Sequence, residues 1–262
     1  MAEQQIRFDD GAAYERMMGV WSRLAGETFL DWLKPDHGRK WIDVGCGNGA
    51  FTEMVARRCA PAGIQGVDPS EGQLAFARTR GGTAPAEFRV GDAMALPFPA
   101  RAFDVAVMAL VIFFVPDPAK GVAEMVRVTS TGGTVAAYAW DMEGGGFPLR
   151  PILTELRAIG LNPARPPSVA ASRMEALQAL WTDAGMTEVE TRRIDVQRTF
   201  SNFEDVWESA KLAPTMGPAL ASLSPDDLAQ VKARVRESLP EDSAGRVTYG
   251  AWANAVKGRV PT

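Results

Sequence analysis

The chain has 262 residues, and 28 lysines and arginines against 32 aspartates and glutamates give it a net charge of −4. This mild acidity argues against nucleic-acid binding, because nucleic-acid-binding proteins normally carry a basic surface. One histidine is too few for a multi-histidine metal site, and two cysteines are too few for a disulfide framework. No apolar run is long enough to span a membrane, and the N-terminal segment lacks the apolar core of a signal peptide. We therefore expect a cytoplasmic protein with no metal, membrane span or nucleic-acid partner.

Strands and helices are predicted to alternate in the first half of the chain. A helix with a wide apolar stripe is expected over residues 12–34, with a break near Gly19. Short apolar strands separated by helical segments are predicted after it, at residues 41–45, 63–68, 87–90, 103–110 and 134–140. This alternation predicts β-α-β units and a parallel sheet.

Polar capping residues mark the expected helix starts. Ser70 and Gln73 form a capping box, and Asp117 precedes a proline at the first helical position. The helix that begins there is expected to end at the glycine pair 132–133. Three further starts are predicted by the same signals, at Ser172 with Glu175, at Ser201 with Glu204, and at Ser224 before Pro225.

The second half of the chain is less regular. Residues 141–171 are rich in glycine and proline, which predicts a loop-bearing insertion. Residues 187–199 and 246–257 are predicted strands separated by helices over 201–243. Two such late strands indicate an antiparallel addition to one edge of the sheet.

The segment DVGCGNGA, residues 43–50, lies where a strand ends and a helix begins. Open α/β sheets bind ligands at this position, and glycines at 45 and 47 let a ligand approach the backbone. The spacing also satisfies the GxGxxA fingerprint of dinucleotide-binding proteins, with Asp68 near the place of their ribose-binding acid. A tight turn without a ligand is the third interpretation.

Acidic residues end three successive predicted strands. Asp43 would repel a pyrophosphate but would suit a ligand that carries an ammonium and a sulfonium. Asp68 could accept hydrogen bonds from the two hydroxyls of a ribose, or it could cap the following helix. Asp92 with the amide of Ala93 could bind an adenine edge, or Asp92 could be a simple turn residue. All three acids are expected at the same edge of one sheet.

These motifs resemble the class I S-adenosylmethionine-dependent methyltransferases, and most closely the small-molecule group that includes the ubiquinone/menaquinone-biosynthesis C-methyltransferases. The resemblance rests on WIDVGCGNGAFTEMVA, GVDPSEGQLAFAR, VGDAMALPFPARAFDVAVMALVIFFVPDP and GGTVAAYAW, between about residues 40 and 140. The stretch YERMMGVWSRLAGETFLDWL also resembles a leading helix that covers the cofactor in part of the family.

The resemblance implies an α/β, Rossmann-like, doubly wound fold with a mostly parallel seven-stranded sheet, an antiparallel last strand and helical lid insertions. It implies one methyltransferase domain over 1–262, divided into a helical cap (1–40), a cofactor-binding core (41–140), substrate-lid insertions (141–171 and 201–243) and the last two strands (187–199 and 246–257).

The resemblance also implies roles for individual residues toward S-adenosylmethionine. The methionine end is held by Asp43, Gly45, Cys46 and Gly47, with the carbonyl of Ala109 close by. The ribose is bound by Asp68, and the adenine is contacted by Pro69, Gln73, Asp92 and Ala93. Tyr14 and Trp21 are candidate lid residues, although aromatic residues at helical spacing are more often part of the core.

Catalysis is harder to assign. The donor methyl is already activated, so the protein mainly positions the two reactants. A general base is needed only if the acceptor must lose a proton, and Tyr14, Tyr138 and Asp141 are candidates by position alone. His37 lies at the opposite sheet edge and is interpreted as a surface residue. Cys46 and Cys59 are interpreted as structural.

The expected reaction is methyl transfer to a small, partly apolar acceptor with an acidic group. The walls of the acceptor site are expected in the leading helix, 141–171 and 201–243. Arg150 and Arg165 are expected to contact an anion, and an apolar surface is expected from Phe147, Phe200, Phe203, Trp207 and Met216. A non-catalytic S-adenosylmethionine-binding protein is one alternative. An NAD(P)-dependent oxidoreductase is another, disfavoured because no Tyr-x-x-x-Lys pair is present and Asp43 has the wrong charge.

Overall fold

The computed structural model describes residues 11–262, with side chains from Glu15 onward. Over this range a seven-stranded sheet has the order β3-β2-β1-β4-β5-β7-β6. β1 to β5 are parallel, and β7 is antiparallel to both β5 and β6. This order and the antiparallel β7 confirm the predicted doubly wound, Rossmann-like sheet. The strands are β1 (Lys40–Val44), β2 (Gly63–Asp68), β3 (Ala86–Val90), β4 (Phe103–Ala109), β5 (Thr129–Trp140), β6 (Thr187–Phe200) and β7 (Val247–Arg259).

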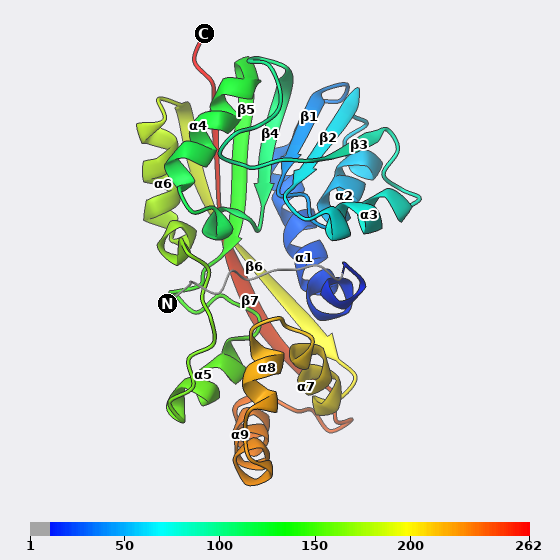
Figure 1. The fold of residues 1–262 in the computed structure, drawn as a ribbon, viewed down its shortest axis with the longest axis vertical. Coiled ribbons are helices and arrows are strands. Elements are labelled where there is room, and N and C mark those ends of the chain that lie inside the picture. Colours follow the sequence, from blue (N-terminus) through cyan, green and yellow to red (C-terminus); the bar gives the residue numbers. More distant parts are fainter. Residues whose placement is uncertain (1–10) are drawn as a thin grey trace.

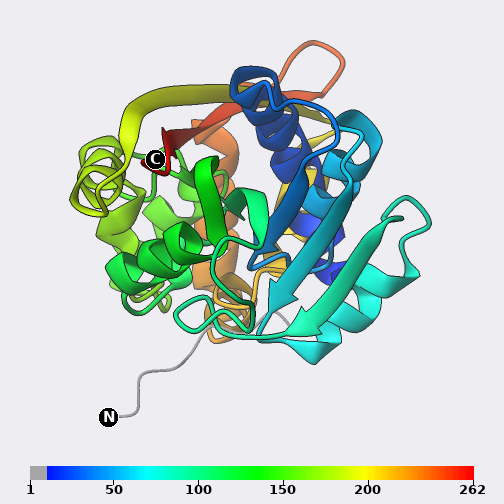
Figure 2. The same ribbon diagram turned by 90° about the horizontal axis from the view of Figure 1, so that it is seen from above.

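Helices cover the sheet and extend beyond one end of it. α1 (Gly11–Leu33) packs against α2 (Ala50–Arg58), α3 (Glu71–Thr79) and β6, and Figure 2 shows it crossing beside β6 and β7. α4 (Pro118–Val128) and α6 (Met174–Asp183) pack together. Below them β6 and β7 run into a separate group of helices (Figure 1), which comprises α5 (Arg150–Ala158), α7 (Phe203–Lys211), α8 (Met216–Ala221) and α9 (Pro225–Ser238). Two short 3₁₀ turns are η1 (Ile112–Phe114) and η2 (Val169–Ser172).

α1 is continuous through Gly19, so the predicted break there is wrong. The helix buries one face in the core, where Trp21, Ala25 and Phe29 have no exposed surface. This burial explains the continuity, since tertiary packing outweighs the weak helix propensity of one glycine.

β5 begins at Thr129, five residues before the predicted start, because α4 ends at Val128. The glycine pair 132–133 therefore lies inside the strand and does not end the helix. Gly132 has a positive φ of 72° and donates its amide to the carbonyl of Val260 over 2.8 Å. Pairing with the end of the chain thus extends the strand backward.

Three of the predicted helix starts are confirmed and two are wrong. The side chains of Ser70, Asp117 and Ser224 accept the expected backbone hydrogen bonds. Ser172 instead is buried and donates to the carbonyl of Val169 over 2.7 Å, so α6 begins without a side-chain cap. The cap of α7 is Asn202, one residue after Ser201. No helix of the described chain is long and apolar enough to cross a membrane.

Candidate functional site

The glycine loop between β1 and α2 has backbone geometry that other residues adopt only with strain. Gly45 and Gly47 have φ values of 75° and 51°. A Cβ on Gly45 would lie 2.5 Å from the side chain of Val111, whereas a Cβ on Gly47 would meet nothing closer than 3.9 Å. Position 45 therefore requires glycine for packing, and position 47 leaves open space in which a ligand could approach the backbone.

Asp43 is 2% exposed at the end of β1. Its Oδ2 accepts a hydrogen bond of 2.6 Å from the hydroxyl of Thr52, and its buried Oδ1 has no hydrogen-bond partner among the described residues. Burial raises the pKa of this carboxyl to about 7, the Thr52 bond opposes the rise, and the charge of Asp68 adds to it. A buried oxygen without a donor fits a cationic ligand group such as an ammonium.

Asp68 ends β2 and connects the glycine loop to the start of α3. Its Oδ2 accepts from the amide of Gly47 and its Oδ1 from the amide of Ser70, each over 2.9 Å. Burial raises the pKa of Asp68, and the two backbone bonds oppose that rise. Each carboxylate oxygen keeps a further acceptor position, so both interpretations of Asp68, the helix-end contact and a ribose contact, are compatible with this geometry.

The remaining residues of the expected cofactor site lie along the same edge of the sheet. Asp92 follows β3 and accepts from the amide of Met94 over 2.8 Å, which makes it a turn residue in the absence of a ligand. Ala109 ends β4 and is half-buried. The other members differ in exposure: Pro69 is exposed, Ala93 is half-buried, and Gln73 and Cys46 are buried. Burial raises the pKa of the Cys46 thiol well above its usual range, which fits a structural cysteine.

Tyr138 and Asp141 lie at the carboxyl end of β5, on the same sheet edge, but both side chains are engaged within the protein. Tyr138 is 1% exposed and its ring lies 4.6 Å from that of Phe29, between β5 and α1. Asp141 accepts from the amide of Gly144 over 2.7 Å and from the indole of Trp252 over 3.2 Å, so it stabilises a turn. His37 is exposed before β1.

Trp21, a candidate lid residue on α1, lies in the core. It has 0% exposure and packs against Tyr249, with ring centres 5.1 Å apart. Of the two interpretations given for Trp21, this position fits the core residue and not the lid residue. The side chain of Tyr14 lies outside the described residues.

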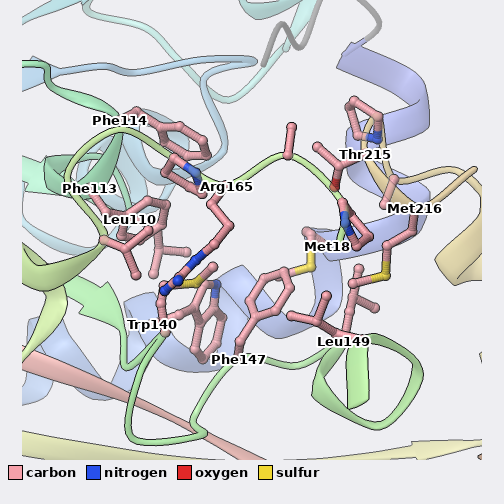
Figure 3. Close-up of a pocket in the computed structure, with 18 of the residues that line it drawn as sticks. Met18, Leu110, Phe113, Phe114, Trp140, Phe147, Leu149, Arg165, Thr215 and Met216 are labelled. Carbon is pink, nitrogen blue, oxygen red and sulfur yellow. The ribbon is translucent and has the colours of Figure 1, made fainter. Parts of the chain in front are cut away.

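An apolar pocket lies among the residues that Figure 3 labels, which come from α1, η1, α8 and the segments between them. It holds about 840 Å³ of empty space, including the part open to solvent. Leu110, directly before the Val111 that touches Gly45, lines the pocket and adopts a strained positive φ of 63°. Walls come from α1, η1, the end of β5, α5, the 163–169 segment and α8, through Met17, Met18, Leu110, Phe113, Phe114, Trp140, Met142, Phe147, Leu149, Leu153, Arg157, Pro163, Ala164, Arg165, Pro166, Val169, Ala213, Pro214, Thr215 and Met216.

The sequence anticipated part of this lining. Phe147, Arg165 and Met216 line the pocket, whereas Arg150 does not. The aromatic residues expected from 200–207 are core residues at most 4% exposed, namely Phe200, Phe203 and Trp207. Trp140 and Arg157 were missed: Trp140 belonged to a predicted buried strand, and Arg157 lies in a segment whose helix was not recognised.

Arg80 joins α1 to the glycine loop. Its guanidinium donates to the carbonyl of Asn48 over 2.6 Å, to Glu53 over 2.9 Å and to Glu15 of α1 over 2.5 Å. The side-chain amide of Asn48 also donates to Glu15 over 3.2 Å. The loop and α1 are therefore held together by the Arg80 guanidinium and by the Asn48–Glu15 hydrogen bond.

Comparisons with known proteins agree with this architecture. Residues 42–137 match the family model described as a methyltransferase domain. The chain is 31% identical over 168 residues to demethylmenaquinone methyltransferase of Renibacterium salmoninarum, covering 62% of this chain and 67% of that protein. It is 29% identical over 149 residues to aklanonic acid methyltransferase DauC of Streptomyces sp. strain C5, covering 55% and 68%. It spans about half the length of several other curated relatives that it matches.

Solved structures show the same fold. Phosphoethanolamine N-methyltransferase 2 of Haemonchus contortus, solved with S-adenosylhomocysteine, superposes with a TM-score of 0.58 at 18% identity, covering 95% of this chain and 57% of that one.

On the family model and the Renibacterium relative, the chain belongs to the class I S-adenosylmethionine-dependent methyltransferases. S-adenosylmethionine is accordingly its methyl donor.

Proposed function

We propose that this protein transfers a methyl group from S-adenosylmethionine to a small molecule bound in the apolar pocket. The observation that carries the proposal is the contact between Gly45 and Val111, which places the pocket residue Leu110 next to the glycine loop. The relatives named for aklanonic acid and demethylmenaquinone support an apolar small-molecule acceptor.

S-adenosylmethionine is proposed to bind at the carboxyl ends of β1 to β4. Asp43 would face the ammonium group with its unpartnered Oδ1, and the open space over Gly47 would admit the methionine end. Asp68 would accept from the ribose hydroxyls, and Asp92 with the amide of Ala93 would meet the adenine. Gly45, Cys46, Pro69, Gln73 and Ala109 complete the proposed surface.

The protein's contribution to the reaction is positional. S-adenosylmethionine supplies an electrophilic methyl group on a positively charged sulfur. The pocket walls hold an acceptor in line with that methyl and exclude water, and such alignment can lower a barrier by several kcal/mol. Residues 1–40, 141–171 and 201–243 are proposed to cover the acceptor as parts of a single domain.

The cysteines and the net charge bear on the compartment and on the partners. The two cysteines are free and buried, which fits a compartment that keeps thiols reduced, and we infer the cytoplasm. The net charge of −4 gives no support to a nucleic-acid partner.

Thermal unfolding in the presence of candidate ligands tests the donor assignment. Ligand at 100 times its dissociation constant adds about 2.7 kcal/mol to the free energy of unfolding, so S-adenosylmethionine and S-adenosylhomocysteine should raise the melting temperature. Asp68→Ala should remove this shift while the protein stays folded. A shift with NAD instead would support the oxidoreductase alternative.

Turnover is tested separately, by screening small molecules with a labelled methyl donor. Label recovered in a small molecule supports the proposal. Donor binding with label passing only to protein or RNA would overturn the small-molecule assignment, and donor binding with no transfer across the screen would favour the non-catalytic alternative.

A further inference from the structure

The lining of the apolar pocket carries charge of one sign. Arg157 and Arg165 are its ionisable members, and no aspartate or glutamate belongs to the described lining. Figure 3 shows the Arg165 side chain crossing the pocket toward Trp140. Because the rest of the described lining is uncharged, these guanidinium groups are the ones that would attract an anion into the pocket.

Arg165 is loosely held by the protein itself. Its Nη2 lies 3.5 Å from Glu143, beyond a good hydrogen bond, and the Arg165 side chain is about half exposed. Glu143 is bound more closely by Arg173, at 2.8 Å. A bound anion could therefore take Arg165 from Glu143 without leaving that carboxylate unpaired.

Among the described lining residues there is also no histidine, cysteine, tyrosine, lysine or acid that could remove a proton near neutral pH. Tyr138 and Asp141, the described candidates from the sequence, are held in the core and in a turn. The described lining therefore suits an acceptor whose reacting atom needs no base from these residues.

We propose that the acceptor is an oxygen acid on an apolar, aromatic-sized body, and that it binds and reacts as its anion, paired with Arg165. This inference rests on the proposed function. The acceptor's anionic oxygen supplies the electron pair of the new carbon–oxygen bond, and the methyl–sulfur bond breaks with its pair going to sulfur. A neutral methylated product forms, and no proton passes to the protein.

The test measures binding of 2-naphthoate and of the uncharged 2-naphthamide by calorimetry, with S-adenosylhomocysteine present. We expect the acid to bind at least about tenfold more tightly than the amide, which corresponds to about 1.4 kcal/mol. Arg165→Gln should remove this preference and leave the amide unchanged, and Glu143→Gln should tighten the acid. Arg150→Gln, an exposed arginine that does not line the pocket, is the matched control.

Equal affinity for the acid and the amide, or an equal loss of both in Arg165→Gln, would overturn the inference. A second pair of ligands, 2-naphthol and 2-methoxynaphthalene, adds an independent readout. The affinity for the naphthol should rise as the pH passes through the pKa of the phenol itself, whereas the ether should show no such change. If S-adenosylhomocysteine does not bind at all, the proposed function fails. If it binds and the acid is not preferred, only this inference fails.

Discussion

Arg80, which follows α3, donates a hydrogen bond of 2.5 Å to Glu15 near the start of α1. The same guanidinium holds the carbonyl of Asn48 in the glycine loop and the carboxylate of Glu53 in α2. The side chain of Arg80 is 14% exposed, so water competes weakly for these bonds. One side chain thus links α1 to the loop proposed to hold the donor.

Arg80→Lys should weaken both stability and donor binding. Lysine keeps the charge but cannot form the three directed bonds of a guanidinium, and a hydrogen bond to a charged group typically contributes about 1.5–3 kcal/mol. Urea unfolding should show this decrease, and calorimetry should show a higher dissociation constant for S-adenosylhomocysteine. Arg78→Lys, at the more exposed pair with Glu71, is the control and should change neither value appreciably.

Gly45→Ala should destabilise the protein more than Gly38→Ala. Both glycines have positive φ, 75° and 72°, so both substitutions introduce similar backbone strain of about 1 kcal/mol. Only at position 45 does the new Cβ also meet a side chain, that of Val111 at 2.5 Å, while position 38 is open. Overpacking adds about 1–3 kcal/mol.

Denaturant unfolding of the two variants measures the difference directly. Adding Val111→Ala to Gly45→Ala should recover the overpacking part and leave the strain part. If the two single variants lose equal stability, the close approach of Val111 to the loop does not constrain the fold.

The sequence predicted the sheet and the positions of the strand ends better than the lining of the apolar pocket, for a physical reason. Asp43, Gly45 and Asp68, which are proposed to hold the donor, lie at the ends of neighbouring strands, and strand ends follow from local hydrophobic pattern and turn chemistry. The apolar pocket is assembled from segments as distant as Met17, Trp140 and Met216. Nothing in the local sequence of these segments indicates which of their faces will meet.

The incorrect helix starts have a similar origin. Ser172 has the local pattern of a cap, but its hydroxyl is buried, where it donates to Val169 and accepts from the amide of Met142 over 3.2 Å. At α7 the neighbouring Asn202 competes for the same role and accepts from the amide of Asp205 over 3.0 Å. Local capping signals therefore locate a helix start to within a residue or two, and tertiary contacts select the residue.

Asp43 makes stability and donor affinity respond to pH in opposite directions. Burial raises the pKa of its carboxyl to about 7, whereas an unfolded aspartate ionises near pH 4. Between these values the folded protein without ligand holds a proton that the unfolded chain has lost. The free energy of unfolding from this group therefore decreases as the pH rises from about 4 through 7. Donor binding should instead strengthen over the upper part of that range, because the ammonium pairs with the ionised carboxylate.

Asp43→Asn tests both effects, since asparagine keeps the shape but cannot ionise. Without ligand at about pH 8, where the wild-type carboxylate is ionised and buried, the variant should be at least as stable as the wild type. Its affinity for S-adenosylmethionine should fall about tenfold or more and should no longer rise between about pH 5.5 and 7.5. Thr52→Val, which removes the bond that lowers the pKa of Asp43, should move the wild-type rise in affinity to higher pH. Calorimetric titrations across this range decide the point, and an unchanged pH dependence in Asp43→Asn would show that another group faces the ammonium.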